Sequence, residues 1–296
     1  MNKPLFSGCA VAVATTFKPD TSVDYIAYEK LVAYLITNGA DAIVACGTTG
    51  ESATLSEQEQ YEIVRCAVAT SSGKVPVIAG AGSNSTEHAV ALAKKAKEAG
   101  AQAVLTVSPY YNKPTQRGLV AHFSTQANAV PDMPFYLYNV AGRTACNIEP
   151  ATCAELSKVD NIVGVKEASG NIVQVAEIAA ACGSGFEMHS GNDDQVVPVL
   201  SLGGIGCISV LANIAPKFVH DMVSAYLNGD HSKAKDMQLK AMPLVRALFV
   251  ETNPIPVKAA LKLMGLDSGV YRLPLCEMSE ANQEFLKREM ESFGLI

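Results

Sequence analysis

The stretch Ile162-Val163-Gly164-Val165-Lys166 is a short apolar run that ends in a lysine. Similar runs rich in Val, Ile and Ala recur along the chain, at residues 9–15, 42–45, 75–79, 103–107, 135–138, 186–189 and 206–208. Most of these eight runs are too continuously apolar for a sheet with one face in water. They therefore predict parallel strands that are covered on both sides.

Segments with helical periodicity separate the apolar runs. The first carries an apolar stripe and ends at Asn38-Gly39, which is typical of a helix end. The second begins with Ser56 and Glu59, which have the spacing of a capping box. Strand and helix alternate through eight units without a topological break. This order favours a closed (β/α)8 TIM barrel over an open, doubly wound sheet.

The pattern changes after about residue 225. Strand-like runs stop, and residues 230–250, 256–264 and 279–293 look helical, with a kink expected at Pro243. We therefore expect an α/β barrel over residues 1–225 that carries the active site. A small, all-helical C-terminal appendage is expected over residues 226–296.

The composition is that of a globular, acidic protein. The chain has 296 residues, of which 49% are hydrophobic and 18% charged, and its net charge is −6. With no basic cluster to offset this charge, nucleic acid is an unexpected partner. No stretch approaches the roughly 18 apolar residues of a membrane span, and no apolar leader precedes Cys9. We expect a cytoplasmic protein without a membrane partner.

The cysteines and histidines do not form a metal-binding pattern. None of the eight cysteines belongs to a CxxC pair, and no two of the five histidines lie at ligand spacing. The sequence therefore predicts no metal site. It argues against a metal-dependent aldolase or hydrolase.

Lys166 is the strongest catalytic candidate. Side chains at the C-terminal ends of barrel strands face the active site. Period-two alternation puts Ile162, Gly164 and Lys166 on the inner face, and Val163 and Val165 on the outer face. A lysine there is partly removed from water, which favours the neutral amine that forms a Schiff base with a carbonyl. The alternative is a lysine that reaches solvent or pairs with the next residue, a glutamate.

Other strand ends carry polar side chains that suit the same chemistry. Tyr138 is expected to face the interior one strand away and could shuttle protons, or could simply be a core tyrosine. Thr48 and Thr49 lie in a glycine-flanked turn that either holds a carboxylate or is an ordinary turn. Arg143 follows the fifth strand in a loop, where it could grip a second carboxylate or form a surface ion pair.

Six strings of sequence point to a family. They are GTTGES at 47–52, SPYYN at 108–112, YNVAGRT at 138–144, GVKE at 164–167, SG at 190–191 and NPIPVK at 253–258. In this order and spacing they resemble the dihydrodipicolinate synthase / N-acetylneuraminate lyase family over essentially the whole chain. The Gly-Arg-Thr string looks like the synthase branch of that family.

The resemblance implies a reaction. Members of the synthase branch condense pyruvate with aspartate 4-semialdehyde to give 4-hydroxy-tetrahydrodipicolinate, in the biosynthesis of lysine and diaminopimelate. No cofactor would be needed, because a lysine Schiff base supplies the electron sink. The implied roles are the Schiff base (Lys166), a proton relay (Tyr138, Thr48 and Tyr111), the pyruvate carboxylate site (Thr49), the carboxylate site of the second substrate (Arg143), and the rest of the pocket (Gly191 and Ile208).

The resemblance also implies an assembly. The family is commonly a homotetramer, built as a dimer of tight dimers. The tyrosine that matches Tyr111 comes from the neighbouring subunit of the tight dimer.

The chain departs from the family at two places. Ala141 replaces the proline of the YNVPGRT string, which predicts a looser loop around Arg143 but not a changed reaction. At the family's allosteric lysine site, histidines are replaced by Glu57 and Gln60, and an acid that would hold the lysine α-amino group is replaced by a histidine. We therefore hypothesise weak or absent lysine inhibition. The possible allosteric positions are Ser52, Ala53, Asn84, His88 and Tyr110.

Two other functions remain open. One is a pyruvate-dependent class I aldolase or lyase that acts on a sugar acid, although Arg143 suits a short acidic aldehyde better. The other is a non-catalytic barrel that senses pyruvate-like ligands, against which the set Lys166, Tyr138 and Thr48 argues. A borohydride-trapped pyruvate adduct on Lys166 would support the aldolase readings and exclude the sensor.

Overall fold

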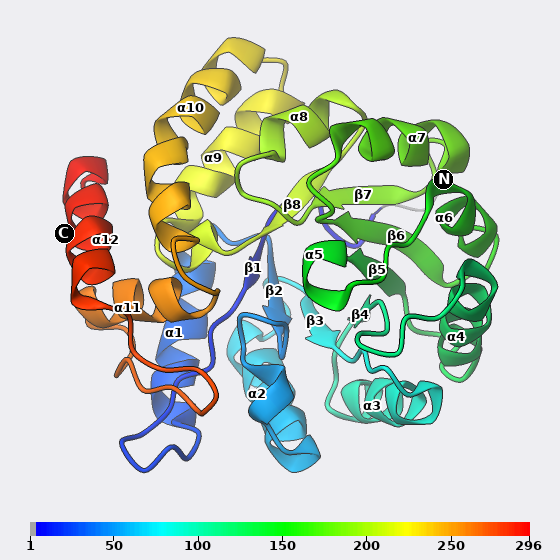
Figure 1. The fold of residues 1–296 in the computed structure, drawn as a ribbon, viewed down its shortest axis with the longest axis horizontal. Helices are drawn as coiled ribbons and strands as arrows, with labels where there is room; N and C mark the ends of the chain where they lie inside the picture. Colours follow the sequence, from blue (N-terminus) through cyan, green and yellow to red (C-terminus); the bar gives the residue numbers. More distant parts are fainter. Residues whose placement is uncertain (1–3) are drawn as a thin grey trace.

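The structure is a computed structural model that describes residues 4–296. Within these residues, eight parallel strands close into a barrel in chain order, and β8 pairs with β1 (Figure 1). The (β/α)8 barrel predicted from the sequence is confirmed. The strands are β1 Gly8–Ala12, β2 Ala42–Ala45, β3 Val77–Gly80, β4 Ala103–Val107, β5 Phe135–Asn139, β6 Ile162–Glu167, β7 Glu187–Ser190 and β8 Gly206–Ser209.

Helices surround the barrel and cover the outer faces of its strands (Figure 1). The predicted capping box of Ser56 and Glu59 begins the second helix, and the first helix is capped by Asn38. The surrounding helices are α1 Tyr25–Thr37, α2 Glu57–Ser71, α3 Thr86–Glu98, α4 Gln116–Asn128, α6 Pro150–Leu156, α7 Ile172–Cys182, α8 Val196–Ser201 and α9 Pro216–Leu227. None of the helices in residues 4–296 is both long and apolar enough to cross a membrane.

The chain after the barrel is helical, as predicted. It forms α10 His231–Leu248, α11 Ile255–Leu263 and α12 Glu280–Phe293, on one side of the barrel (Figure 1). Buried residues of these helices, such as Leu244, Val257 and Leu286, belong to the same apolar core as the outer faces of the strands. The expected boundary at residue 225 falls inside α9, and the division into two domains stays a prediction.

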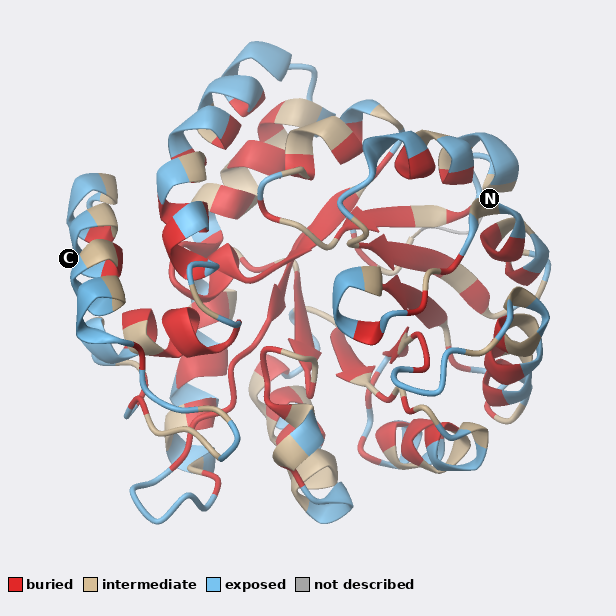
Figure 2. Cartoon of the chain, viewed as in Figure 1, coloured by how far each residue is buried: buried red, intermediate tan, exposed pale blue. Residues whose placement is uncertain are grey.

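The interior of the barrel forms a core of its own. Small residues such as Ala10, Ala42 and Ala103 line it together with Tyr136 and Tyr138. The alternate residues of the strands pack outward against the helices, and the strands are buried almost throughout (Figure 2). The expected inward direction of Tyr138 is therefore confirmed, and Tyr136 shares it.

The start of β6 differs from the predicted alternation. Ile162 packs with the outer core, whereas Val163 packs against the interior core. The reason is a register shift between β5 and β6, which makes Val163 an extra residue, as in a β-bulge. Regular pairing resumes at Gly164, so Lys166 faces the interior as predicted.

The first strand is shorter than predicted. It ends at Ala12 instead of Thr15. The backbone N–H of Ala14 donates to Asn213 Oδ1 at 3.1 Å, so a side chain replaces the neighbouring strand as its partner. A continuous apolar run does not reveal such a change of partner.

Candidate active site

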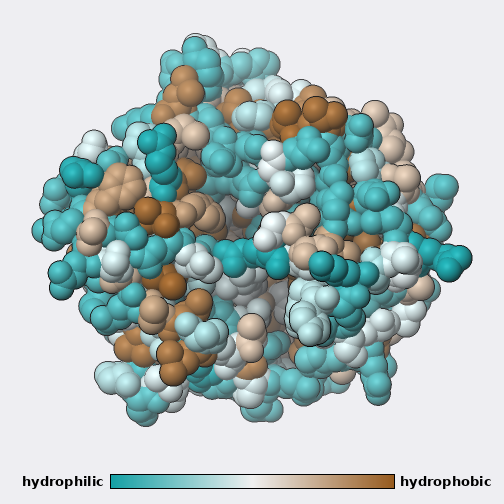
Figure 3. Space-filling view, viewed as in Figure 1, coloured by the Kyte–Doolittle hydropathy of each residue, from teal (hydrophilic) through white to brown (hydrophobic). Residues whose placement is uncertain are grey.

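A small cavity lies at the C-terminal ends of the strands. Its volume is about 60 Å³. About 10–15 Å³ of such space holds one water, so the cavity takes only a molecule of a few non-hydrogen atoms. Figure 3, drawn from the same side as Figure 1, shows this face hollowed near its centre. The walls include the predicted residues Thr48, Thr49, Tyr138, Arg143, Lys166 and Gly191.

Lys166 is buried in this cavity, where it forms no ion pair with residues 4–296, although its charge acts on the buried Asp193 carboxylate and offsets part of the rise in pKa that burial causes there. Only 5% of the residue is exposed, and its Nζ lies 4.3 Å from the centre of the Tyr138 ring. Tyr138 and Lys166 are direct partners in the β5–β6 register. Within residues 4–296, Lys166 forms no ion pair, because the adjacent Glu167 accepts instead from Asn139 Nδ2 at 2.9 Å and Ser169 N at 2.7 Å. The alternative of a Lys166–Glu167 pair is wrong.

Two glycines make room for the lysine and its strand. A Cβ on Gly164 would lie 2.2 Å from the carbonyl oxygen of Glu187 on β7. A Cβ on Gly191 would lie 3.0 Å from both Cγ and Cε of Lys166. Any side chain at residue 191 would therefore displace the amine, so Gly191 shapes the pocket by having none.

The turn after β2 presents Thr49 to the cavity. The turn closes with Gly50 N–H donating to the Gly47 carbonyl at 3.0 Å, and Glu51 has a left-handed φ of 53°. Thr49 is 2% exposed, and its hydroxyl oxygen accepts from Asn253 Nδ2 at 3.0 Å. A hydroxyl has a single proton, and this contact leaves the Thr49 proton free to donate to an anion.

Arg143 lies in a short helix, α5 Ala141–Thr144, rather than in the expected loop. The N–H groups of Arg143 and Thr144 both donate to the Val140 carbonyl, which winds the segment into one turn. Arg143 Nη2 donates to the Asn253 carbonyl at 3.1 Å. No carboxylate pairs with Arg143 in the described part of the chain, so the alternative of a surface ion pair is wrong. The other guanidinium donors can bind a carboxylate.

Asn253 was not assigned a role from the sequence. It is 5% exposed, and it bonds to Thr49 through its side chain and to Arg143 through its backbone. Asn253 and Phe249, which also lines the cavity, lie between α10 and α11. The C-terminal helical part therefore completes a site that the barrel begins. Its only signal in the sequence was the NPIPVK string.

Two predicted residues lie outside the cavity lining. Tyr111 is 89% exposed and has a left-handed φ of 73°. Ile208 is fully buried in the barrel interior, and Val210, two residues further on, lines the cavity instead. One chain therefore brings together six of the eight expected catalytic and binding residues.

The possible allosteric residues also lie outside the catalytic cavity. Asn84 Nδ2 donates to the Tyr110 carbonyl at 3.2 Å, which brings two of them together. Ser52 and Ala53 belong to a 3-10 turn, Ser52–Thr54, after the Thr48–Thr49 turn. His88 lies near the start of α3.

Asp193 ties the segment after β7 to the end of β8. Its carboxylate accepts from Ser209 Oγ at 2.5 Å, Val210 N at 3.0 Å and Leu211 N at 2.8 Å. Burial raises the pKa of Asp193 above its usual range. The bonds occupy the carboxylate, so Asp193 supports the wall of the cavity.

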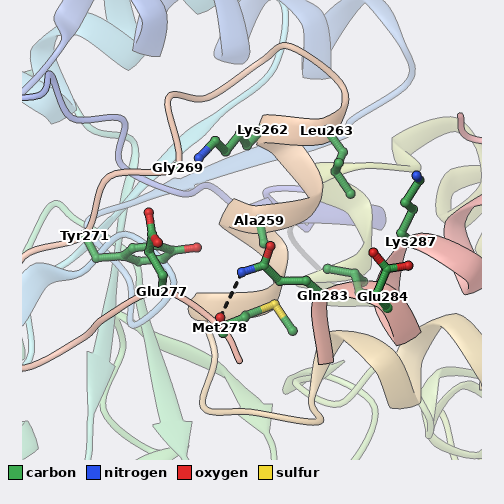
Figure 4. Close-up of a pocket in the computed structure, with 11 residues that line it drawn as sticks. Ala259, Lys262, Leu263, Gly269, Tyr271, Glu277, Met278, Gln283, Glu284 and Lys287 are labelled. Atoms are coloured by element: carbon green, nitrogen blue, oxygen red, sulfur yellow. Dashed lines mark hydrogen bonds between the residues drawn. The ribbon is translucent and has the colours of Figure 1, made fainter. Parts of the chain in front are cut away.

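A larger cavity of about 350 Å³ lies between α11, the loop that follows it and α12 (Figure 4). Its wall carries Lys262 and Lys287 as well as Glu277 and Glu284. It shares no lining residue with the catalytic cavity, and thus takes no part in the site. Among residues 4–296, no three His, Cys, Asp or Glu side chains are grouped so that they could hold a metal ion.

The geometry suits one kind of chemistry. In the described part of the chain, a buried amine that forms no ion pair lies against a phenol. A free hydroxyl proton and a guanidinium with no carboxylate partner share the cavity with them. An amine in this setting can attack a carbonyl carbon, while the hydroxyl and the guanidinium hold carboxylates. The ligand that fits is a small 2-oxo acid.

Comparison with known proteins agrees with this chemistry. A sequence profile of the dihydrodipicolinate synthetase family matches residues 5–292. A 4-hydroxy-tetrahydrodipicolinate synthase from Thermoanaerobacter sp. (strain X514) is 54% identical over 294 residues, which cover 99% of this chain and 98% of that protein.

Solved structures are equally similar. The crystal structure of a dihydrodipicolinate synthase from Cyanidioschyzon merolae with lysine bound has a TM-score of 0.97 and 44% identity, and the match covers 99% of this chain and 100% of the other. A chloride-inhibited dihydrodipicolinate synthase from Acinetobacter baumannii, complexed with pyruvate, has a TM-score of 0.96 and 41% identity, with 98% and 99% covered.

Proposed function

The chain belongs to the dihydrodipicolinate synthetase family, and from this premise we propose that it is a lyase that condenses pyruvate with aspartate 4-semialdehyde. The product is 4-hydroxy-tetrahydrodipicolinate, an intermediate of lysine biosynthesis. The observation that carries the proposal is the buried amine of Lys166, which forms no ion pair among residues 4–296 and lies 4.3 Å from the centre of the Tyr138 ring.

The first half of the reaction is imine formation. The pyruvate carboxylate accepts a hydrogen bond from the Thr49 hydroxyl and lies against the backbone N–H groups of the Thr48–Thr49 turn. The Lys166 amine attacks the keto carbon, and the resulting carbinolamine loses its hydroxyl as water to leave a protonated imine. Tyr138, beside the amine, supplies and takes up the protons of these steps, with Thr48 in the same wall.

The second half is carbon–carbon bond formation. Loss of a methyl proton converts the imine to an enamine, whose terminal carbon attacks the aldehyde carbon of the second substrate. The aldehyde oxygen takes a proton and becomes the hydroxyl of the product. The amino group of the substrate then attacks the imine carbon, which closes the ring and releases Lys166. Arg143 holds the carboxylate of this second substrate.

Borohydride trapping tests the proposal. Incubation with pyruvate and borohydride is expected to add one reduced pyruvate per chain, located on Lys166 by peptide mapping. Turnover with aspartate 4-semialdehyde is then expected to exceed turnover with N-acetylmannosamine. Absence of the adduct would refute the mechanism, and a preference for N-acetylmannosamine would favour the sugar-acid alternative. Relatives at about half identity that are synthases do not favour that alternative.

We further propose that the active unit is a tight dimer within a homotetramer in the cytoplasm. Support comes from Tyr111, which is exposed in one chain although the family resemblance gives it a relay role. Mixing inactive Tyr111→Phe and Lys166→Ala subunits tests the idea, because a hybrid dimer regains one site with both residues. Recovery of activity on mixing is expected, and no recovery would mean that Tyr111 does not act across subunits.

Lysine is proposed to inhibit weakly or not at all. In the allosteric region, Glu57 Oε1 lies 3.4 Å from His88 Nε2, and the same carboxylate forms an ion pair with Lys95. Glu57 is therefore already compensated and a poor partner for the amino group of free lysine. A lysine titration of initial rates is expected to show no inhibition at micromolar concentration, and inhibition there would refute this proposal.

A further inference from the structure

A second cavity adjoins the catalytic one. It has a volume of about 400 Å³, and its lining comes from the last turns of α10 with Phe249 and from the segment that links β7 to α8. Asn192 and Phe249 line both cavities, so the two share a wall. We call this larger cavity the antechamber.

The volumes of the two cavities indicate which substrate each can hold. The catalytic cavity, at about 60 Å³, has room for roughly four to six waters. A three-carbon acid bound to Lys166 occupies that space. A second substrate must therefore bind outside the catalytic cavity before it reacts. The antechamber is large enough, because its volume falls within the range of about 300–1,000 Å³ that is usual for small-molecule sites.

The antechamber carries two opposite charges that do not neutralise each other. Asp194 and Arg246 both line it and are both exposed. Neither forms an ion pair with any residue in the range 4–296, so the guanidinium nitrogens of Arg246 lie more than 4.0 Å from the carboxylate oxygens of Asp194. Separated and uncompensated charges of opposite sign match a ligand that carries both an ammonium and a carboxylate group.

The remaining lining suits the rest of such a ligand. Met242, Val245 and Phe249 form an apolar wall next to the charged pair. Phe249 also borders the cavity that contains Arg143, another arginine that forms no ion pair among residues 4–296. A substrate carboxylate that leaves Arg246 can therefore bind next to the guanidinium of Arg143, on the other side of Phe249.

We propose that the antechamber is a binding site for the aldehyde substrate in its zwitterionic form. Arg246 takes the α-carboxylate, Asp194 takes the α-ammonium group, and the aldehyde end points past Phe249 toward the enamine. This assignment rests on the proposed function, since it takes aspartate 4-semialdehyde as the second substrate. It adds two residues that position this substrate before it reaches Arg143.

Charge-removing variants test the site. Arg246→Gln and Asp194→Asn are each expected to raise the KM for aspartate 4-semialdehyde about five- to tenfold. Each variant loses one charged contact with the substrate, and this fold-change corresponds to a loss of about 1–1.5 kcal/mol in binding free energy. The kcat at saturation, the KM for pyruvate and the yield of trapped imine are expected to stay within twofold of the parent. Arg246→Lys is expected to restore most of the affinity.

A substrate analogue without the amino group tests the contacts of Arg246 and Asp194 separately. Succinate semialdehyde lacks the amino group, so its inhibition constant is expected to rise in Arg246→Gln and to be unchanged in Asp194→Asn. Arg288→Gln is the matched control, because Arg288 is an exposed arginine on α12 that lies against Phe285 and away from both cavities. Its KM values are expected to equal those of the parent.

The outcomes distinguish a failure of the antechamber assignment from a failure of the proposed catalytic function. If Arg246→Gln matches Arg288→Gln in its KM for the aldehyde, the antechamber does not bind this substrate, whatever the mechanism. If the parent enzyme traps no pyruvate, the proposed function itself fails. A rise in both KM values together would mean that the variant disturbs the catalytic cavity, which would also overturn the assignment.

Discussion

Two buried lysines lie in contrasting regions of the molecule. Lys166, at the mouth of the barrel, and Lys258, on α11, are 5% and 0% exposed, and the Nζ of each lies 4.3 Å from the centre of an aromatic ring. Lys258 Nζ donates to Glu51 Oε1 at 2.5 Å and to the Val270 carbonyl at 2.6 Å. Lys166 has no such partner within residues 4–296.

The difference separates a structural lysine from a reactive one. A buried charge is tolerated when a counterion and hydrogen bonds replace its water, as they do around Lys258. That ion pair joins α11 to the end of the Thr48–Thr49 turn, because Glu51 closes the turn. Within residues 4–296, Lys166 forms no ion pair, so its amine is not held by a counterion and can attack a substrate carbonyl. Two lysines of similar burial thus have different roles: Lys258 stabilises the fold, and Lys166 is the candidate nucleophile.

The largest effect is expected from Lys166→Met. This change removes the nucleophile and keeps the apolar stem, so we expect activity to fall by on the order of 10⁴-fold or more, with no pyruvate adduct after borohydride. The midpoint of urea unfolding should be unchanged or higher, because an uncompensated amine is lost. Retained turnover would show that Lys166 is not the Schiff-base lysine.

Lys258→Met is the matched change in the other region. It leaves Glu51 buried without its counterion, and we expect it to lower the free energy of unfolding by about 3–5 kcal/mol. Protein that remains folded should still trap pyruvate. A double variant with Glu51→Leu should recover part of the loss. If Lys258→Met unfolded at the parent's urea midpoint, the contrast between the two lysines would not hold.

Asn253→Ala probes the boundary between the two regions, since Asn253 precedes Lys258 on the same segment but contacts catalytic side chains. We expect kcat/KM to fall about tenfold, through a higher KM for pyruvate, because one hydrogen bond to Thr49 is worth about 1–1.5 kcal/mol. Asn161→Ala is the control. It removes hydrogen bonds to three carbonyls away from the cavity and should lower stability without changing KM.

His189 is a buried titratable group, and neither of its ring nitrogens has a hydrogen-bond partner within residues 4–296. It is stacked on Phe6 at 4.2 Å in the barrel interior, and burial lowers its pKa from 6.5 to about 3. Below pH 6.5 the unfolded chain binds a proton that the folded chain does not. The free energy of unfolding therefore falls as the pH drops from about 6.5 toward 3, by up to about 1.4 kcal/mol per pH unit.

His189→Leu should remove this part of the pH dependence. Between pH 8 and pH 5.5, the parent should lose about 1.4 kcal/mol more stability than the variant, measured by urea unfolding at each pH. Equal losses in the two proteins would mean that His189 takes up a proton in the folded state.

Much of the fold was predictable because its signals are local. Eight apolar runs, a capping box at Ser56 and Glu59, and the end of α1 at Asn38 all depend on neighbouring residues, and all were found. The bulge at Val163 was missed because it depends on the register with β5. The short helix α5 was missed because four residues leave too little pattern.

The candidate site likewise combines features that local sequence signals predict and features that only the packing of distant segments reveals. By itself, the sequence determined that Lys166, Tyr138, Thr49 and Arg143 stand at strand ends, because chain order and period-two alternation set which side chains meet at one end of a barrel. Only the tertiary structure decided that Lys166 forms no ion pair among residues 4–296. It also decided that Asn253, more than a hundred residues beyond Arg143, bonds to two of these side chains. Such contacts depend on how α10 and α11 pack against the barrel, and no local pattern encodes packing between distant segments.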